Sequence, residues 1–156
     1  MQLREYLRDQ QIAFDVIEHD PTYDASRMAQ AVHVAGQEVA KTVLLRTGED
    51  GNFNYVVAVL PATHSVNFEQ VAEALGVSQV ELASEAEIDE QCSDCESGVL
   101  PPFGSQYGMQ TIVDESLTED EEIVFEGNTH QESIRMRYAD FDALEQPFIA
   151  RFAQRR

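Results

Sequence analysis

Apolar residues recur every three or four positions in several stretches of the chain, and this spacing predicts amphipathic helices. The stretches lie at 3–7, 25–32, 68–75, 85–92 and 140–152. Two of them begin with a capping pattern, because Asn67 precedes Gln70 by three positions and Ser84 precedes Glu87 in the same way. Pro147 interrupts the last stretch, so we expect the closing helix to bend or break there.

Other stretches are rich in β-branched and aliphatic residues, which predicts strands. They lie at 14–17, 39–45, 55–60, 109–113, 123–126 and 133–138. The stretch 55–60 is apolar throughout, as expected of a central strand covered on both faces. Helices and strands alternate early in the chain and strands cluster late. We therefore expect an α/β fold over residues 1–156, a single compact domain whose mixed sheet is flanked by helices.

Size and composition support one globular domain. The chain has 156 residues, of which 43% are hydrophobic, so it can bury a substantial core. No stretch approaches the roughly 20 apolar residues of a membrane helix, and we expect no membrane partner. The first residues lack the apolar core of a signal peptide, which predicts a cytoplasmic protein.

The charge of the chain limits its partners. The formal net charge is −19, from 29 acidic and 10 basic residues. Such a surface repels polyanions, which argues against DNA or a long RNA duplex as the main partner. Because charges are screened over about 8 Å at physiological salt, a small basic pocket could still hold one nucleotide end.

Lys41 is the only lysine of the chain and lies inside the predicted strand 39–45. Side chains alternate along a strand, so Lys41 shares a face with Val39, Val43 and Leu45. An ammonium group among aliphatic side chains is costly unless it meets an anion or lines a wet cleft. An edge-strand lysine whose stem packs while its head reaches water explains the pattern equally well. The sequence leaves both interpretations open.

A stiff loop with Gly98, Pro101, Pro102 and Gly104 precedes the next predicted strand. Proline fixes the backbone and removes a donor, whereas glycine permits close approach or positive φ. Such a loop can aim backbone N–H groups at a developing oxyanion, so Lys41 and this loop form the first candidate site. An ordinary loop at the start of a strand is the alternative.

The turn that ends at His130 is a second candidate. A histidine in a turn can act as acid, base or recognition donor, although a solvated turn residue is the commoner case. His19, His33 and His64 stand alone, and no HExxH or similar metal spacing occurs. The sequence predicts neither a metal nor a cofactor.

Cys92 and Cys95 form a CxxC pattern. A closed zinc site needs four ligands, and the chain has no second cysteine pair. A thioredoxin-like motif should open a helix after a strand, whereas this one ends a predicted helix. We expect a structural or incidental role. Two cysteines cannot build a disulfide framework, which fits a reducing compartment.

Taken in order, these segments resemble the YbaK/prolyl-tRNA synthetase editing-domain family. The resemblance covers nearly the whole chain and rests on four segments: His19-Asp20-Pro21, the strand around Lys41, the GxxxP loop from Gly98 to Pro102, and Gly127-Asn128-Thr129-His130. It implies a partly barrel-like mixed sheet flanked by helices, and hydrolysis of the ester of mischarged aminoacyl-tRNA without a metal. The Pro101-Pro102-Phe103-Gly104 variant is closer to less-studied freestanding branches than to the Cys-tRNA deacylases.

The resemblance also implies roles for individual residues. Lys41 would hold the terminal adenosine phosphate or the ester region, and the backbone from Gly98 to Pro102 would bind the carbonyl oxygen and exclude bulky side chains. The further residues implied to contact substrate are Tyr23, Val99, Leu100, Pro101, Phe103, Gly104, Gly127 and His130. His130 matches a position that tunes amino-acid discrimination in some members of the family. No side chain stands out as general base, so the substrate's ribose hydroxyl or a bound water would take that role.

The main hypothesis is a trans-editing deacylase that removes a small non-cognate amino acid from the 3′ end of a mischarged tRNA. An aminoacyl-tRNA synthetase is a further candidate partner. The first rival is a binding module without catalysis, which captures an aminoacyl-tRNA or docks on a synthetase. A small redox protein that uses Cys92 and Cys95 is the second rival.

Overall fold

The computed structural model describes residues 1–18 and 37–155. The helices are α1 (Leu3–Asp9), α3 (Phe68–Leu75), α4 (Glu85–Gln91) and α5 (Tyr138–Glu145), with the 3-10 helices η1 (Gly104–Tyr107) and η2 (Glu115–Glu119). The strands are β1 (Phe14–Glu18), β2 (Gln37–Glu49), β3 (Asn52–Pro61), β4 (His64–Val66), β5 (Gln79–Leu82), β6 (Gln110–Asp114), β7 (Glu122–Glu126), β8 (Glu132–Arg137), β9 (Phe148–Ala150) and β10 (Ala153–Arg155).

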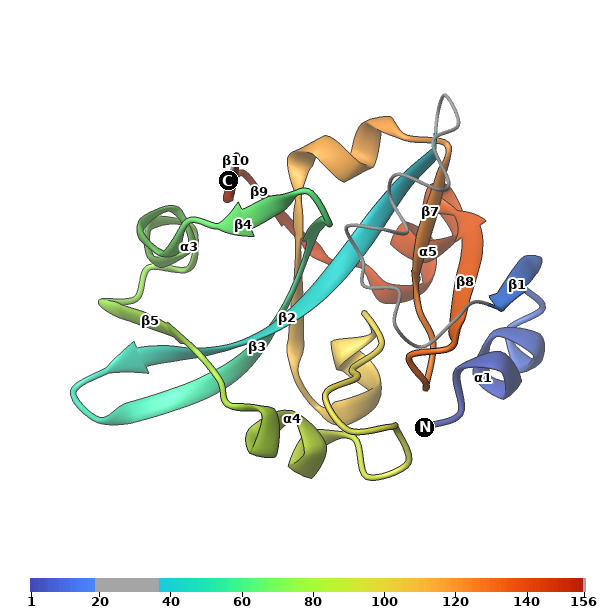
Figure 1. Ribbon diagram of the computed structural model, residues 1–156. Coiled ribbons are helices and arrows are strands. Elements are labelled where there is room, and N and C mark those ends of the chain that lie inside the picture. The colour runs from blue at the N-terminus through green and yellow to red at the C-terminus, as the bar shows by residue number, and fades with distance from the viewer. Residues whose placement is uncertain (19–36, 156) are drawn as a thin grey trace.

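Among the described residues, eight strands form one mixed sheet in the order β1-β8-β7-β2-β3-β6-β9, and β5 pairs with β2 beside this path. The β2–β3 hairpin is antiparallel, whereas β7 joins β2 and β6 joins β3 in parallel. Figure 1 shows β2 and β3 crossing the middle of the fold, with their hairpin tip near β5 and with α1 and β1 at the opposite end. The expected mixed α/β domain is confirmed.

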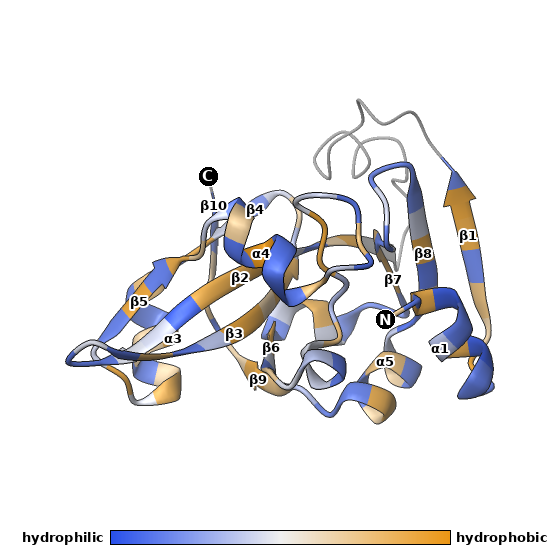
Figure 2. Ribbon diagram, turned by 90° about the horizontal axis from the view of Figure 1, so that it is seen from below, coloured by the Kyte–Doolittle hydropathy of each residue, from blue (hydrophilic) through white to orange (hydrophobic). Residues whose placement is uncertain are grey.

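The core lies on both faces of β3, as its apolar sequence predicts. Residues 56–60 are all buried. On one face, Val57 and Val59 join a large cluster that includes Phe103, and on the other, Ala58 and Leu60 join a smaller one. Figure 2 shows hydrophobic stretches along β2 and β3 inside the fold, while α1 is mostly hydrophilic. Burial on both faces holds β3 inside the core, next to the strand that carries Lys41.

Both predicted N-terminal caps form, but only the one at Ser84 is a reciprocal capping box, because the Asn67 N–H donates to the Phe152 carbonyl at 2.7 Å. The Asn67 side chain accepts a hydrogen bond from the Gln70 N–H at 3.1 Å. Ser84 and Glu87 form a reciprocal capping box at the start of α4. The helix expected at 25–32 lies outside the described residues.

The closing helix differs from its prediction. It begins at Tyr138 and ends at Glu145, where Gln146 adopts a left-handed conformation with φ 48°. Pro147 follows and cannot continue the helix. The chain then forms β9 and β10, which the helical spacing of Phe148, Ile149 and Phe152 had not predicted. Pairing of β9 with β6 decides this segment against its local pattern.

Asp114 joins three elements through one buried carboxylate, which is 4% exposed. Oδ1 accepts hydrogen bonds from the backbone N–H groups of Phe152 and Ala153 at 2.9 and 2.8 Å. Oδ2 accepts from the N–H and the hydroxyl of Ser116. Burial alone would raise the pKa of Asp114, but these hydrogen bonds outweigh it and hold the pKa below its ordinary value.

Asp114→Asn is expected to lower the free energy of unfolding by about 1–3 kcal/mol at neutral pH, because the Ser116 N–H and hydroxyl lose their acceptor. A depressed folded pKa contributes stability above the unfolded value near 3.9, and that stability is lost as the pH falls through the folded pKa. Urea unfolding between pH 7 and 3 should therefore show a shallower acid dependence in the variant. Glu49→Gln, at an exposed position, is the control; equal pH slopes for wild type and Asp114→Asn would contradict the assignment.

No helix in the described ranges is long and apolar enough to cross a membrane.

Candidate active site

Among the residues that the structure describes, the middle of β2 pairs with a strand on one side and has no strand on the other. β7 pairs with Gln37–Val39 and β5 pairs with Leu45–Gly48. Between these pairings, residues 40–44 have β3 alone as a partner. We call this segment the β2 window. The sequence could not show it, because it depends on where two distant strands stop.

The alternation of hydrogen bonds between β2 and β3 decides which backbone groups of β2 face the β2 window. The Ala62 N–H donates to the Val39 carbonyl at 2.8 Å, so odd-numbered residues of β2 point their backbone groups toward β3. Even-numbered residues therefore point theirs toward the window side. The Ala83 N–H donates to the Leu44 carbonyl from that side at 3.0 Å, as this parity requires. The backbone of Thr42 thus faces the opening.

A hollow of about 120 Å³ lies at the β2 window. Its described lining combines β2, the glycine–proline loop, the end of β7 and the turn after β7; the residues are Ala40, Lys41, Thr42, Gly98, Val99, Leu100, Glu126 and His130. We call it the Lys41 hollow. The half-buried Lys41 lies between Val39, which is buried, and Val43, which is half-buried. The structure thus brings together Lys41, the start of the loop and His130, three features that are far apart in sequence.

Hydrogen bonds within the protein hold the loop at Gly98. Gly98 has φ 81°, a conformation that favours glycine. Its N–H donates to Asp89 Oδ1 at 2.9 Å, and the Ser97 hydroxyl donates to Asp89 Oδ2 at 2.8 Å. These two bonds hold the pKa of Asp89 below its usual value. Asp89 on α4 is therefore an anchor of the loop, and no pattern in the sequence pointed to it.

Most backbone donors of the loop are already used. The Val99 N–H donates to the Glu96 carbonyl at 3.0 Å, and the Phe103 N–H donates to the Pro101 carbonyl at 2.8 Å. Pro101 and Pro102 have no N–H. Within the described chain, the Leu100 N–H is the one donor of residues 98–103 that makes no hydrogen bond. If the loop stabilises an oxyanion, the Leu100 N–H is the hydrogen-bond donor available for it.

His130 connects the loop to β7. Its Nδ1 lies 3.3 Å from Glu126 Oε2, and its Nε2 lies 2.8 Å from the Ser97 carbonyl oxygen. The His130 backbone N–H also donates to Glu96 Oε2 at 3.2 Å. Both ring nitrogens face acceptors, and a neutral imidazole can donate to only one of them. Glu126 was not singled out from the sequence, although its position four residues before His130 was a usable signal.

Asn128 holds the same turn in place through three hydrogen bonds. Its Oδ1 accepts from the Leu3 N–H at 2.9 Å, its Nδ2 donates to the Met1 carbonyl at 2.7 Å, and its backbone carbonyl accepts from Glu96 at 2.8 Å. Gly127 begins the turn outside the Lys41 hollow, and an added Cβ there would approach the Glu132 side chain to 3.0 Å. The turn is thus built to place His130.

The later part of the loop lies away from the hollow. Pro101, Pro102, Phe103 and Gly104 are buried and are not among its described lining. Phe103 packs in the core, and the Gly104 N–H donates to Thr111 Oγ1 at 2.9 Å. Tyr23 lies outside the described residues.

Cys92 and Cys95 are joined by a disulfide. The CxxC spacing predicts a structural or incidental role, and nothing in the sequence indicated this bond. With Asp94 they form a cluster of possible metal ligands, but the two sulfurs are bonded to each other and supply no thiolate. Asn128 Nδ2 lies 3.5 Å from Cys95 Sγ, so the bridge lies beside the turn that positions His130.

Comparison with known proteins bears on the chemistry of this site. The family model described as the aminoacyl-tRNA editing domain matches residues 19–144. The Multifunctional Ser/Thr-tRNA deacylase ProXp-y of Escherichia coli (strain K12) is 27% identical over 140 residues, which cover 89% of this chain and 83% of the relative.

Two solved structures are similar in fold. A candidate trans-editing enzyme for prolyl tRNA synthetase has a TM-score of 0.80 at 20% identity, with 97% of this chain and 94% of that one covered. The hypothetical protein APE2540 has a TM-score of 0.84 at 17% identity, with 99% and 100% covered.

Proposed function

The chain belongs to the aminoacyl-tRNA editing domain family, and we propose that it uses the Lys41 hollow to remove serine or threonine from the 3′ end of mischarged tRNA. The chemistry is that of an aminoacyl-tRNA deacylase: trans-editing hydrolysis of the ester that joins the amino acid to the terminal ribose. The named activity of the Escherichia coli relative supports serine and threonine as the first substrates to test.

The observation that carries the proposal is that Lys41 and Leu100, a residue whose N–H is unused within the described chain, line one hollow. In the proposed reaction a water attacks the ester carbonyl carbon, and the carbonyl oxygen gains negative charge. The Leu100 N–H donates to this oxyanion, as a preorganised donor should. The bond to the ribose oxygen then breaks, the ribose leaves with a proton, and the free amino acid is released. Lys41 holds the adjacent phosphate or the ester region by its charge.

The size of the hollow supports a small amino acid. Its 120 Å³ is less than the roughly 150 Å³ of an engineered apolar cavity that holds benzene. Val99 and Leu100 supply its apolar wall. A hydrophobic pocket of a synthetase separates substrates that differ by a methylene or hydroxyl group by only about 10–200-fold, so a second hydrolytic sieve has chemical value.

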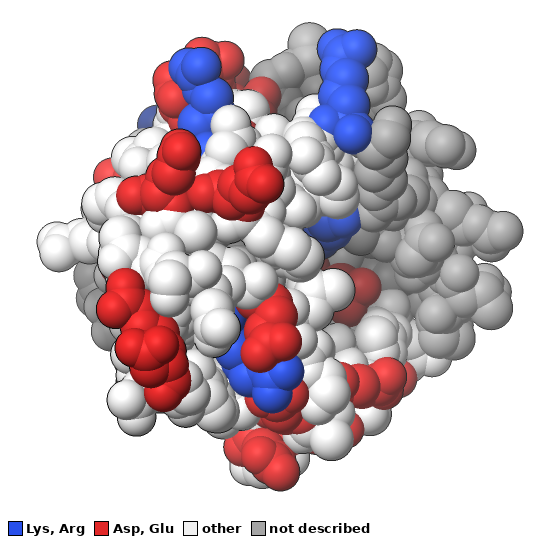
Figure 3. All heavy atoms as spheres, turned by 90° about the vertical axis from the view of Figure 1, so that its left-hand side faces the viewer, with Lys and Arg blue, Asp and Glu red and all other residues white. Residues whose placement is uncertain are grey.

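Charge supports a limited contact with the tRNA. On the face shown in Figure 3, acidic side chains cover more of the surface than basic ones. With a net charge of −19, the protein attracts a long RNA surface poorly. We propose that it contacts chiefly the 3′ end, that a more basic synthetase brings the tRNA to it, and that it works in the cytoplasm.

Single-turnover deacylation with a panel of Ser-, Thr-, Ala- and Cys-charged tRNAs tests the proposal. We expect faster hydrolysis than in buffer for the serine or threonine ester. Hydrolysis of Ala- or Cys-tRNA alone would reject the proposed substrates. No acceleration for any pair would instead favour the binding module without catalysis.

Gly98→Ala is expected to slow deacylation and to cost about 1–2 kcal/mol of stability, because Gly98 has φ 81°. A shifted loop would move the Leu100 N–H away from the ester. Gly51→Ala is the matched control, since Gly51 has φ 84° and nothing lies within 4 Å of its added Cβ. We expect similar losses of stability from the two variants and slower single turnover only for Gly98→Ala. Equal rates would show that the loop conformation does not matter for the reaction.

A further inference from the structure

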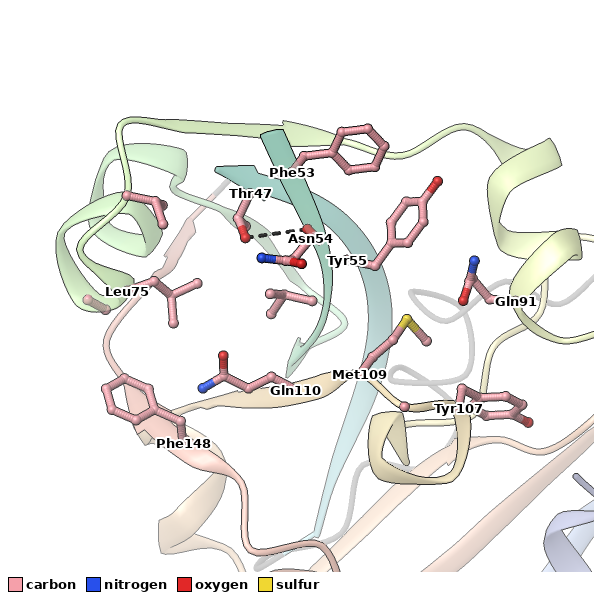
Figure 4. A pocket seen from close by; sticks show the side chains of 14 residues that line it. Thr47, Phe53, Asn54, Tyr55, Leu75, Gln91, Tyr107, Met109, Gln110 and Phe148 are labelled. Carbon is pink, nitrogen blue, oxygen red and sulfur yellow. Dashed lines mark hydrogen bonds between the residues drawn. The ribbon is translucent and has the colours of Figure 1, made fainter. Parts of the chain in front are cut away.

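A second and larger pocket, of about 690 Å³, lies at the other edge of the β2–β3 hairpin. β6 pairs with β3 only from Val56 onward, so residues 53–55 extend past the end of that ladder. The pocket opens there, between the end of α3, the end of α4, η1 and β9 (Figure 4). Its volume is within the range of about 300–1,000 Å³ that is typical of ligand sites.

Aromatic rings and carboxamides dominate the chemistry of this pocket. Figure 4 shows Phe53 and Tyr55 on one side and Tyr107 and Phe148 on the other. We call it the aromatic–amide pocket. Its described lining contains no Lys, Arg, Asp or Glu, in a chain with 29 acidic residues. A neutral, planar ligand suits such a lining better than a charged one.

Three side-chain amides around the pocket have unused hydrogen-bonding capacity. Asn54, Gln91 and Gln110 line it, and within the described chain their side-chain amides make no hydrogen bond. In Figure 4 the amides of Asn54 and Gln110 lie in the space between the rings. Each carboxamide offers two donors and one acceptor oxygen, the pattern with which Asn and Gln recognise base edges.

Contacts within the protein hold two of the rings in place. The Phe53 ring meets Tyr55 edge-on at 5.4 Å, and the guanidinium of Arg46 lies 5.7 Å from the Phe53 centroid. The Tyr55 hydroxyl bonds Glu87 Oε2 at 2.6 Å. Phe148, on the edge strand β9, is 44% exposed. A held ring can stack with a base at a smaller entropic cost than a mobile one.

We propose that the aromatic–amide pocket binds an unpaired nucleobase of the RNA substrate by stacking and amide hydrogen bonds. The proposal rests on the function proposed above, in which the ester of the 3′ end occupies the Lys41 hollow. Thr47 in the pocket lies six positions beyond Lys41 along β2, which spans about 20 Å. Stacked nucleotides rise about 3.4 Å each along a strand, so a short unpaired stretch covers this distance. The bases are the uncharged part of the RNA, so this contact avoids the repulsion between phosphates and an acidic protein.

The test measures how the 156-residue chain binds a short single-stranded RNA that ends in CCA and carries a fluorescent adenine analogue. Phe148→Ala and Gln110→Ala remove exposed side chains from the pocket and should leave the fold intact. We expect each to weaken binding, Phe148→Ala by about 10-fold, the effect of losing one stacking ring. Leu82→Ala, at an exposed position on β5 outside the pocket, is the matched control and should bind as wild type. Wild-type affinity in both pocket variants would overturn the proposal.

Two further measurements separate this proposal from the proposed function. Phe148→Ala should raise KM for the charged tRNA with kcat unchanged, because the pocket is remote from the ester; an unchanged KM would count against the pocket. Lys41→Ala also removes a proposed phosphate contact and should bind the RNA probe more weakly than wild type, but adding Phe148→Ala should weaken binding by the same further factor in both backgrounds. A different outcome is that the wild-type protein hydrolyses no ester, while the pocket variants bind the probe more weakly than wild type. That result would support the pocket and contradict the proposed function.

Discussion

Lys41→Ala is expected to reduce single-turnover deacylation by a factor on the order of 10²–10³, the loss seen when one preorganised charge-stabilising group is removed from an active site. Lys41 is half-buried at the Lys41 hollow, and β2 keeps its full ladder to β3 through this position. Truncation therefore opens no core cavity, and the free energy of unfolding should change little. Single-turnover rates and urea unfolding measure the two effects.

Two matched variants separate charge from bulk at this position. Lys41→Met keeps the length of the stem without the ammonium, and we expect it to be as slow as Lys41→Ala. Lys41→Arg keeps the charge as a planar fork in place of a compact ammonium, so we expect intermediate activity. A Lys41→Ala protein that hydrolysed mischarged tRNA at the wild-type rate would refute the proposed mechanism.

Phe103→Ala is expected to lower the free energy of unfolding by about 3–5 kcal/mol, the largest stability effect proposed here. The Phe103 side chain is fully buried. Its ring contacts Tyr6, Phe125 and Phe141 edge-on, at centroid distances of 5.8, 5.8 and 5.3 Å. Truncation would leave a cavity at the centre of this cluster.

This variant also tests the sequence-based role of Phe103 as a substrate-binding residue. Urea unfolding of Phe103→Ala is compared with that of Phe68→Ala, because Phe68 on α3 is 39% exposed and should tolerate truncation. Phe103→Leu, which fills most of the space, should recover much of the stability. Unchanged stability together with a raised KM would place Phe103 at the substrate and contradict its position in the core.

Local rules predicted most of the elements. The caps at Asn67 and Ser84 follow from side chains three positions apart, and the burial of 56–60 follows from an unbroken apolar run. Lys41 was recognisable as unusual because a strand makes the neighbours of a residue predictable. The short β5 was not predicted, because it is an edge strand that depends on its pairing with β2.

The finer features of the site depend on contacts between distant residues. The β2 window exists because β7 and β5 stop at different points along β2. The role proposed for Leu100 depends on which N–H groups the protein itself occupies, and Asp89 from α4 occupies one of them. No spacing in the sequence reveals such assignments. The expected contact with Tyr23 stays a prediction, since it lies outside the described residues.

The β2 window has a consequence for solubility. An exposed strand edge invites pairing with other chains and aggregation. Within the described part of the fold, β7 and β5 occupy the ladder positions at either end of residues 40–44. An extended segment of another copy would collide with these strands before it gained enough ladder bonds to stay. A single aminoacyl group needs no such length. The short β2 window therefore disfavours strand pairing between copies but can still admit one small residue.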